Sequence, residues 1–191
     1  MGRRPGFDAA QVIAVSRNLF WSRGFDAVSV SDVEAATGLS RSSLYHAFGS
    51  MRGLFDAAVN DYLDNVVRPR LSALRGDDVD GDALPDYLRG LSAAIEHLER
   101  SDAPTGCLLI GTASGTLATD DTIRRVIADY HAELLAAITR GVRARYPSDT
   151  DPEVSARATA ITGAVVAAMT LARVDSAAAV DLVDVTLATL R

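Results

Sequence analysis

The chain has 191 residues, of which 48% are hydrophobic, and a formal net charge of −6 at pH 7. This length suits one sizeable domain, or a small domain joined to a larger one. The longest charge-free run of helical composition, residues 158–172, is shorter than the roughly 20 residues that cross a bilayer, and no apolar stretch follows the amino-terminal arginines as in a signal peptide. The single cysteine, Cys107, leaves no intramolecular disulfide. We therefore expect a cytoplasmic protein without a membrane partner.

Charge and aromatic side chains are distributed unevenly. Residues 1–55 hold six arginines against four acidic residues, net +2, which leaves thirteen arginines and twenty-one acidic residues, net −8, in the remainder. All five phenylalanines and the one tryptophan lie in the first 55 residues. We expect a small basic head with an aromatic core and a larger acidic body with an aliphatic core.

Apolar residues recur at helical spacing along the chain, and no segment alternates with the two-residue period of a strand. The predicted fold is therefore all-α, with about nine helices that form a three-helix head and a helical ligand-binding and dimerisation domain. Glycine is suited to end a helix, and serine is suited to begin one. On this basis the predicted head helices span 8–22, a segment from Ser29 or Ser31 to Gly38, 40–47, and 51–67 after Ser50.

In the body, an acidic Gly- and Asp-rich connection at 76–86 is followed by predicted helices at 84–98, 107–118 and 121–146. The last two predicted helices, 154–172 and 180–190, are more apolar than a small domain needs. We interpret this pair as half of a four-helix interface in a homodimer. The predicted interface residues are Val154, Ala158, Ile161, Val165, Ala168, Ala172, Val180, Val183 and Leu187.

Two short helices joined at Gly38 have the form of a helix-turn-helix. No acidic residue stands between Glu34 and Asp56, although the chain as a whole is acidic. Hydroxyls, an arginine and a phenol near a helix N-terminus suit phosphate oxygens and base edges in a major groove, which carboxylates would repel. We therefore predict that this window faces double-stranded DNA.

Short motifs follow one another from Val12 to Tyr62: Leu19-Phe20, Gly24-Phe25, SVSDV, TGLS, SLYHAF, and Ser50 with Leu54. In this order they resemble the amino-terminal domain of the TetR family of bacterial repressors. The remainder of the chain is similar to the family only in helix count, length and its dimer-like carboxy end. The division that follows is a DNA-binding domain at 1–50 and a ligand-binding and dimerisation domain at 51–191, with 51–67 as connector.

The resemblance implies a transcriptional repressor that a small-molecule inducer releases from a palindromic operator. It places Ser40, Arg41, Ser42, Ser43, Tyr45 and His46 on the recognition helix, and Ser29 and Ser50 at backbone phosphates. Met51 stands where the family usually has lysine, and we expect Arg52 to substitute. Glu34 stands where the family often has alanine.

The inducer cannot be named from the sequence, and the few aromatic residues after position 55 suit flat aromatic ligands poorly. Candidate pocket residues are Leu91, Ile95, Leu98, Cys107, Leu108, Gly111, Tyr130, Leu134 and Met169. Cys107 is open to two interpretations, an oxidant sensor at the start of a helix or a small buried hydrophobe, and the apolar residues that follow it favour the second.

Other functional classes find little support. The three histidines lack ligand spacing, so we expect no metal and no cofactor. GTASG at 111–115 has its serine fourth rather than third and no strand before it, which argues against a nucleophile elbow and an enzyme. The remaining alternative is a helical dimeric interaction or ligand-binding module whose head has lost its affinity for DNA.

Overall fold

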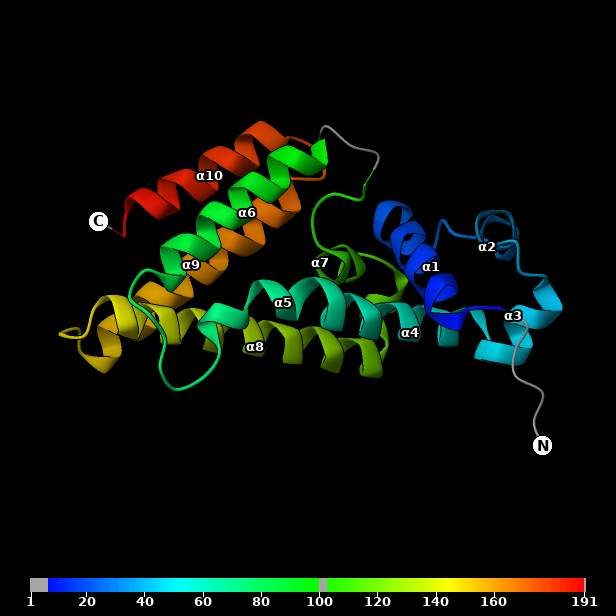
Figure 1. Cartoon of the computed structure of the whole chain (residues 1–191), viewed down its shortest axis with the longest axis horizontal. Coiled ribbons are helices and arrows are strands. Elements are labelled where there is room, and N and C mark those ends of the chain that lie inside the picture. The colour runs from blue at the N-terminus through cyan, green and yellow to red at the C-terminus, as the bar shows by residue number, and fades with distance from the viewer. Residues whose placement is uncertain (1–6, 100–102, 191) are drawn as a thin grey trace.

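The computed structural model describes residues 7–99 and 103–190, and within these ranges it contains helices and no strand. Figure 1 shows an elongated molecule with the amino-terminal helices at one end and the carboxy-terminal helices at the other. We call residues 7–50 the head and residues 51–190 the body. The all-α prediction is confirmed.

Short-range capping explains where the head helices begin and end. Asp8 caps α1 (Ala9–Arg23), Ser29 caps α2 (Val30–Thr37), Ser40 caps α3 (Arg41–Phe48) and Ser50 caps α4 (Met51–Tyr62), each by accepting a hydrogen bond from a backbone N–H of the first turn. Gly38 has φ of 70°, the left-handed conformation that glycine adopts without a steric penalty, and it ends α2. The predicted head helices are confirmed to within a residue or two.

An aromatic cluster holds the head helices on α4. The rings of Phe20 on α1 and Phe55 on α4 meet edge to face with centroids 5.2 Å apart, and Phe25 lies 5.1 Å from Phe55. Arg17 of α1 donates to Asp61 of α4 at 2.6 Å beside this cluster. The head is therefore fixed to a helix that continues into the body.

The helix predicted at 51–67 is confirmed and extends further. After α4 the chain continues without a break through a π-helical turn, η1 (Leu63–Val67), into α5 (Arg68–Arg70), and then through a 3₁₀ turn, η2 (Ser72–Leu74). A π turn spreads more residues over one turn of helix than an α turn does. Val66 and Arg70, four and eight residues after Tyr62, consequently face the interior of the body together with Tyr62.

Four long helices make up most of the body: α6 (Ala83–Glu99), α8 (Asp121–Arg145), α9 (Asp151–Leu171) and α10 (Ser176–Ala188). Helix α10 packs on both α6 and α9, and α8 packs on both α6 and α9 (Figure 1). These helices confirm the helical segments that apolar periodicity predicted in the body. Helix α9 is long and apolar enough to span a membrane by length and composition alone, which is weak support for a span because core helices pass the same test.

The prediction of a single helix at 107–118 is wrong. The structure has a short α7 (Leu108–Thr112), a turn, and a 3₁₀ turn, η3 (Thr116–Thr119). The Thr116 backbone N–H donates to Asp26 Oδ2 of the head at 3.0 Å rather than continuing a helix. A long-range contact therefore replaces the local helical bond.

The expectation of two separate cores is also corrected. Buried apolar residues form one continuous cluster from the head to α10. Trp21 of α1 packs edge to face on Tyr62 at the end of α4, with ring centroids 4.8 Å apart. The head core and the body core therefore meet at this pair.

The apolar stripes predicted as a dimer interface face the interior of a single chain. Of the nine residues, Val180 and Leu187 are half-buried, and the other seven are at most 5% exposed within the chain: Val154, Ala158, Ile161, Val165, Ala168, Ala172 and Val183. A side chain that is already enclosed has almost no surface left for a partner. These stripes are intrachain core, and the predicted homodimer needs another face of the same helices.

Candidate nucleic-acid interface and ligand cavity

Helix α3 presents a polar face to solvent. Leu44 is its one fully buried residue, while Arg41, Ser42, Tyr45 and His46 are exposed. The Arg41 guanidinium lies 5.7 Å from the centre of the Tyr45 ring, within the range of a cation–π contact. This contact holds the cation at the first turn of the helix, where a groove-bound recognition helix reads base edges.

The two carboxylates nearest this face are occupied by the head itself. Asp32 accepts from the hydroxyl and the backbone N–H of Ser29 and pairs with Arg23, and these bonds lower its pKa to about 2. Glu34 Oε1 accepts from the backbone N–H of Arg41 at 2.5 Å. Glu34 therefore stabilises the start of α3, which explains how an acid is accommodated at this position.

The predicted serine contacts differ in availability. Ser29 donates its hydroxyl to Asp32, and Ser40 donates to Ser43 within the first turn of α3. The Ser50 hydroxyl accepts from the Gly53 N–H at 2.9 Å and keeps its own proton for another acceptor. Ser50 also stands at the N-terminus of α4, where the helix dipole favours an anion.

Arg52 does not offer a free cation to phosphate. Its Nη1 and Nη2 donate to the two carboxylate oxygens of Asp120 at 2.8 and 2.9 Å, and its Nε donates to Asp56 at 2.8 Å. Two carboxylates thus balance its charge, which raises its pKa well above the ordinary value. The prediction that Arg52 replaces the missing lysine at position 51 is corrected, because Arg52 joins α4 to the start of α8.

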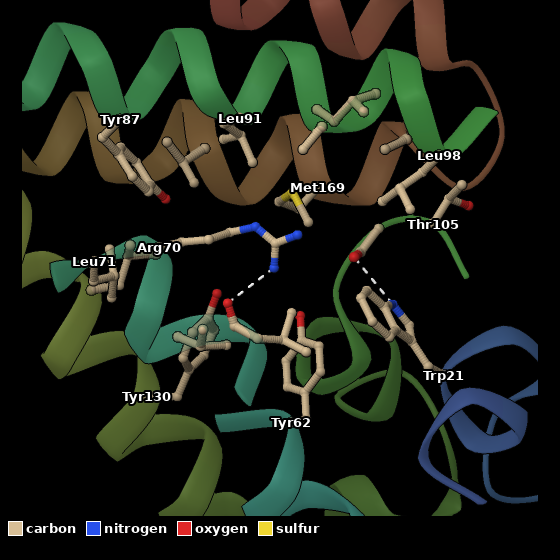
Figure 2. Close-up of a pocket in the computed structure, with 18 residues that line it drawn as sticks. Trp21, Tyr62, Arg70, Leu71, Tyr87, Leu91, Leu98, Thr105, Tyr130 and Met169 are labelled. Carbon is tan, nitrogen blue, oxygen red and sulfur yellow. Dashed lines mark hydrogen bonds between the residues drawn. The ribbon is translucent and has the colours of Figure 1, made fainter. Parts of the chain in front are cut away.

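A narrow cavity of about 50 Å³ lies in the body, with α6 and α9 on one side and the end of α4, η1, α5 and α8 on the other (Figure 2). Six of the nine predicted pocket residues line it: Leu91, Ile95, Leu98, Tyr130, Leu134 and Met169. The other three, Cys107, Leu108 and Gly111, lie outside the lining. The cavity is closed at one end by Trp21 of the head.

Sequence periodicity missed most of the residues that give the cavity its chemistry. Trp21, Tyr62 and Tyr87 join the predicted Tyr130 to give four aromatic side chains, so the expectation that the site suits flat aromatic ligands poorly is not supported by this lining. Arg70 is the one charged side chain among the lining residues that the structure describes, and Figure 2 shows its guanidinium directed into the cavity. The i, i+4, i+8 spacing of Tyr62, Val66 and Arg70 was a signal for a shared helix face, but it does not indicate what that face encloses.

Two hydrogen bonds fasten the head to the body beside the cavity. The Trp21 indole N–H donates to the Gly106 carbonyl at 3.1 Å (Figure 2), and Arg173 after α9 donates to the Trp21 carbonyl at 3.1 Å. Gly106 has φ of 72°, and a Cβ there would lie 2.7 Å from the Met169 carbonyl oxygen. Glycine is required at this position because the backbone passes too close to α9 for any side chain.

A family profile described as "Bacterial regulatory proteins, tetR family" matches residues 12–58, which run from α1 into α4. The "HTH-type transcriptional repressor BdcR" of Escherichia coli (strain K12) is 31% identical over 146 residues, which cover 76% of this chain and 71% of that protein. The chain belongs to the TetR family. It is accordingly a DNA-binding transcriptional regulator and, like its relatives, not an enzyme.

Further comparisons extend the likeness to the body. The "HTH-type transcriptional repressor ComR" of Escherichia coli (strain K12) is 30% identical over 133 residues, 69% of this chain and 61% of that protein. A solved structure of a cysteine mutant of the "TetR family transcriptional regulator CifR", in complex with 26-bp double-strand operator DNA, superposes with a TM-score of 0.80 at 25% identity and covers 98% of both chains. The TetR fold therefore extends over the whole chain, including the region where the sequence resemblance was only architectural.

The lone cysteine of this TetR-family chain is enclosed. Cys107 is 1% exposed, and its Sγ lies 3.8 Å from the Tyr130 hydroxyl. Burial raises the pKa of Tyr130 and of Tyr62, and the neighbouring Cys107 contributes to both shifts. Among the residues that the structure describes, no three histidine, cysteine, aspartate or glutamate side chains are grouped as a metal site would require.

Proposed function

We propose that this protein is a homodimeric repressor that binds a palindromic operator in the cytoplasm and is released from it by a small molecule. The observation that carries the proposal is the position of Trp21, which belongs to a head helix and also closes the cavity of the body. A ligand that displaces Trp21 breaks its hydrogen bond to Gly106 and loosens the attachment of α1 to the body. The same residue thus connects the ligand site to the DNA-binding head.

The proposed contacts with DNA divide into two kinds. Arg41, Ser42, Tyr45 and His46 form the exposed face of α3 and are proposed to meet base edges and phosphates in the major groove. Ser50, with the first N–H groups of α4, is proposed to bind a backbone phosphate. Ser29, Ser40 and Ser43 act mainly through the caps that hold these helices in place.

The proposed dimer uses a face of α10 that the single chain leaves uncovered. On α10, Val185 is 64% exposed and Ala178 and Leu182 are half-buried at helical spacing before it, and Val174 in the turn that precedes α10 is 83% exposed. On α9 a stripe of small residues is likewise exposed, and a Cβ added at Gly163 would meet open space. Small and apolar side chains of this kind allow two helix pairs to approach closely.

A dimer of heads reads two half-sites about one helical turn of DNA apart, roughly 34 Å. Repression then depends on the distance between the two α3 helices, and a ligand that moves α1 changes this distance. Ligand and operator therefore weaken each other's binding by the same factor, as linkage requires. The cavity is smaller than the ~300–1,000 Å³ of common ligand sites, so a ligand has to widen it, which supplies the movement.

The test uses fluorescence anisotropy with labelled DNA from the region upstream of the protein's own gene. We expect dimer binding that weakens steeply between low and high salt, because phosphate contacts release counterions. The control is a scrambled fragment of equal length. Binding to neither fragment at low salt would favour the alternative, a helical dimeric module with a degenerate head.

A further inference from the structure

The single cation of the cavity is held in place without a counter-charge. Arg70 donates through Nη1 to the Val66 carbonyl at 3.0 Å, one turn earlier in the same helix (Figure 2). None of the described carboxylates forms an ion pair with it, whereas Arg68 and Arg75 on either side both pair with Glu133. The Arg70 guanidinium keeps most of its five N–H donors for another acceptor.

The rest of the wall is apolar or donates hydrogen bonds. No aspartate or glutamate is among the lining residues in the described part of the chain, so an organic cation would find no counter-charge there. The phenol groups of Tyr62, Tyr87 and Tyr130 have pKa values that burial raises above the ordinary value, which keeps these groups protonated at neutral pH. A protonated phenol can donate a hydrogen bond to an oxyanion, and it carries no negative charge that would repel the anion.

Size and shape restrict the body of the ligand. Leu91, Ile95, Leu134 and Met169 contribute aliphatic side chains to the lining beside the aromatic rings. Arg70 also borders two shallower depressions on the outer surface, which places it where the cavity opens to solvent. A ligand whose charged group remains near the opening, with its apolar portion directed inward, satisfies both environments at once.

We infer that the cavity binds a small organic anion, in which a carboxylate or similar oxyanion pairs with Arg70 and an apolar body lies against Trp21 and the tyrosines. This inference rests on the proposed function, in which the same cavity receives the releasing ligand. It adds the chemical class of that ligand. Arg70 is then the residue that selects anions over neutral molecules of the same shape.

Two fluorescent probes separate charge from shape. Anilinonaphthalene sulfonate and phenylnaphthylamine share one aromatic body, and only the first carries an anionic group. Each is titrated into the full-length protein without DNA, and Trp21, the one tryptophan of the chain, reports proximity through quenching and energy transfer. We expect the wild-type protein to bind the sulfonate about tenfold more tightly than the neutral probe, because hydrogen bonds to a charged group are the strong ones.

Arg70→Met keeps the apolar stem and removes the charge. It should abolish the preference for the sulfonate and leave the affinity for the neutral probe unchanged. The matched control is Arg125→Met on the exposed surface of α8, away from the lining, which should behave as wild type. Equal affinities for both probes in the wild type, an equal loss of both in Arg70→Met, or unchanged Trp21 emission would each overturn the inference.

A second measurement uses an aliphatic pair, decanoate and decanol, to displace the neutral probe. We expect decanoate to compete at lower concentration than decanol in the wild type and to lose this advantage in Arg70→Met. The result is independent of DNA binding. If decanoate binds through Arg70 but leaves operator affinity unchanged, the ligand class stands and the regulatory coupling fails.

Discussion

Helix α3 and the surface of the body treat their arginines differently. Many exposed arginines of the body face carboxylates at close range, as in the pairs of Arg145 with Asp82 at 2.9 Å and Arg143 with Asp151 at 2.8 Å, although Arg70 of the cavity does not. On α3, the Arg41 guanidinium faces an aromatic ring, and Glu34 accepts from the Arg41 backbone N–H rather than from the guanidinium. Positive potential therefore lies where a cation remains unpaired, and the number of arginines in a region does not determine its location.

The DNA-facing surface of the head and the cavity of the body are also built from different kinds of contact. Helix α3 exposes a polar face that short local caps hold in place, whereas the cavity is assembled from residues of several helices that are far apart in the sequence. The regions meet at Trp21 and Asp26, which contact Gly106 and Thr116. A change at one binding surface can reach the other through these contacts.

The largest effect should come from placing a charge inside the body. Val183 on α10 is 1% exposed, and Val183→Asp would bury a carboxylate without a partner. We expect it to lower the free energy of unfolding by more than about 3 kcal/mol, with loss of the folded chain in urea unfolding followed by circular dichroism.

The matched variant, two residues away, separates stability from assembly. Val185 is 64% exposed, so Val185→Asp should leave the folded chain intact and convert the dimer to monomer in sedimentation velocity. A dimer that persists in Val185→Asp would show that the interface does not use this face of α10. A fully stable Val183→Asp would contradict the assignment of the inner stripe to the core.

The next largest effect concerns the unpaired cation of the head. Arg41→Ala should weaken operator binding by about 1–3 kcal/mol if the guanidinium reads a guanine, and it should leave thermal unfolding unchanged because the side chain is exposed. Anisotropy titrations against the operator measure the loss, with Arg124→Ala, a surface arginine of α8, as control. Unchanged affinity in Arg41→Ala would remove this residue from the DNA contact surface.

A smaller effect is expected at the ion pair between Arg52 of α4 and Asp120 at the start of α8. The Arg52 guanidinium and the Ile123 and Thr122 N–H groups hold the pKa of Asp120 well below its ordinary value of 3.8. Such a carboxyl stabilises the fold at pH values above its ordinary pKa. This stabilisation is lost as the pH falls toward the lowered pKa of the folded state. Asn caps helices about as well as Asp, so Asp120→Asn removes the charge but keeps the start of α8.

We therefore expect Asp120→Asn to lower Tm by no more than about 4 °C at pH 7, and the difference from wild type to shrink below pH about 4. Arg52→Gln should lower Tm at least as far, because it also breaks the pair with Asp56, and adding Asp120→Asn to it should change little because their shared pair is already lost. A Tm difference that grows as the pH falls would contradict the assigned pairing.

Much of the head could be predicted from sequence because its determinants are local. Ser40, Ser50 and Gly38 act on backbone groups within a few residues, so a short motif contains both partners of each interaction. Arg52 shows where this reasoning ends, since its main partner, Asp120, is 68 residues away and no spacing rule connects them.

The body was predictable as helices but not as a site. Periodicity identified the inner stripes of α9 and α10 correctly as apolar, yet it could not show whether another helix of the same chain or a partner covers them. The cavity depends on Trp21 reaching the body from the head and on Gly106 allowing close backbone approach. Both are tertiary contacts that amphipathic patterns do not encode.

The smallest effect is expected at Cys107, a residue of the body that belongs to neither binding surface. Its thiol is buried at the start of α7, with Tyr130 as its hydrogen-bond partner, and only a partly exposed thiolate reacts readily with oxidants. Cys107→Ser should leave operator affinity within about twofold of wild type, and peroxide should not release the wild-type protein from DNA. The measurement is operator anisotropy before and after peroxide for both proteins, with reductant added afterwards as the reversal control. Release of the wild type but not of Cys107→Ser would establish an oxidant sensor at this position and would mean that the thiol becomes exposed when the contacts between Trp21 and Gly106 open.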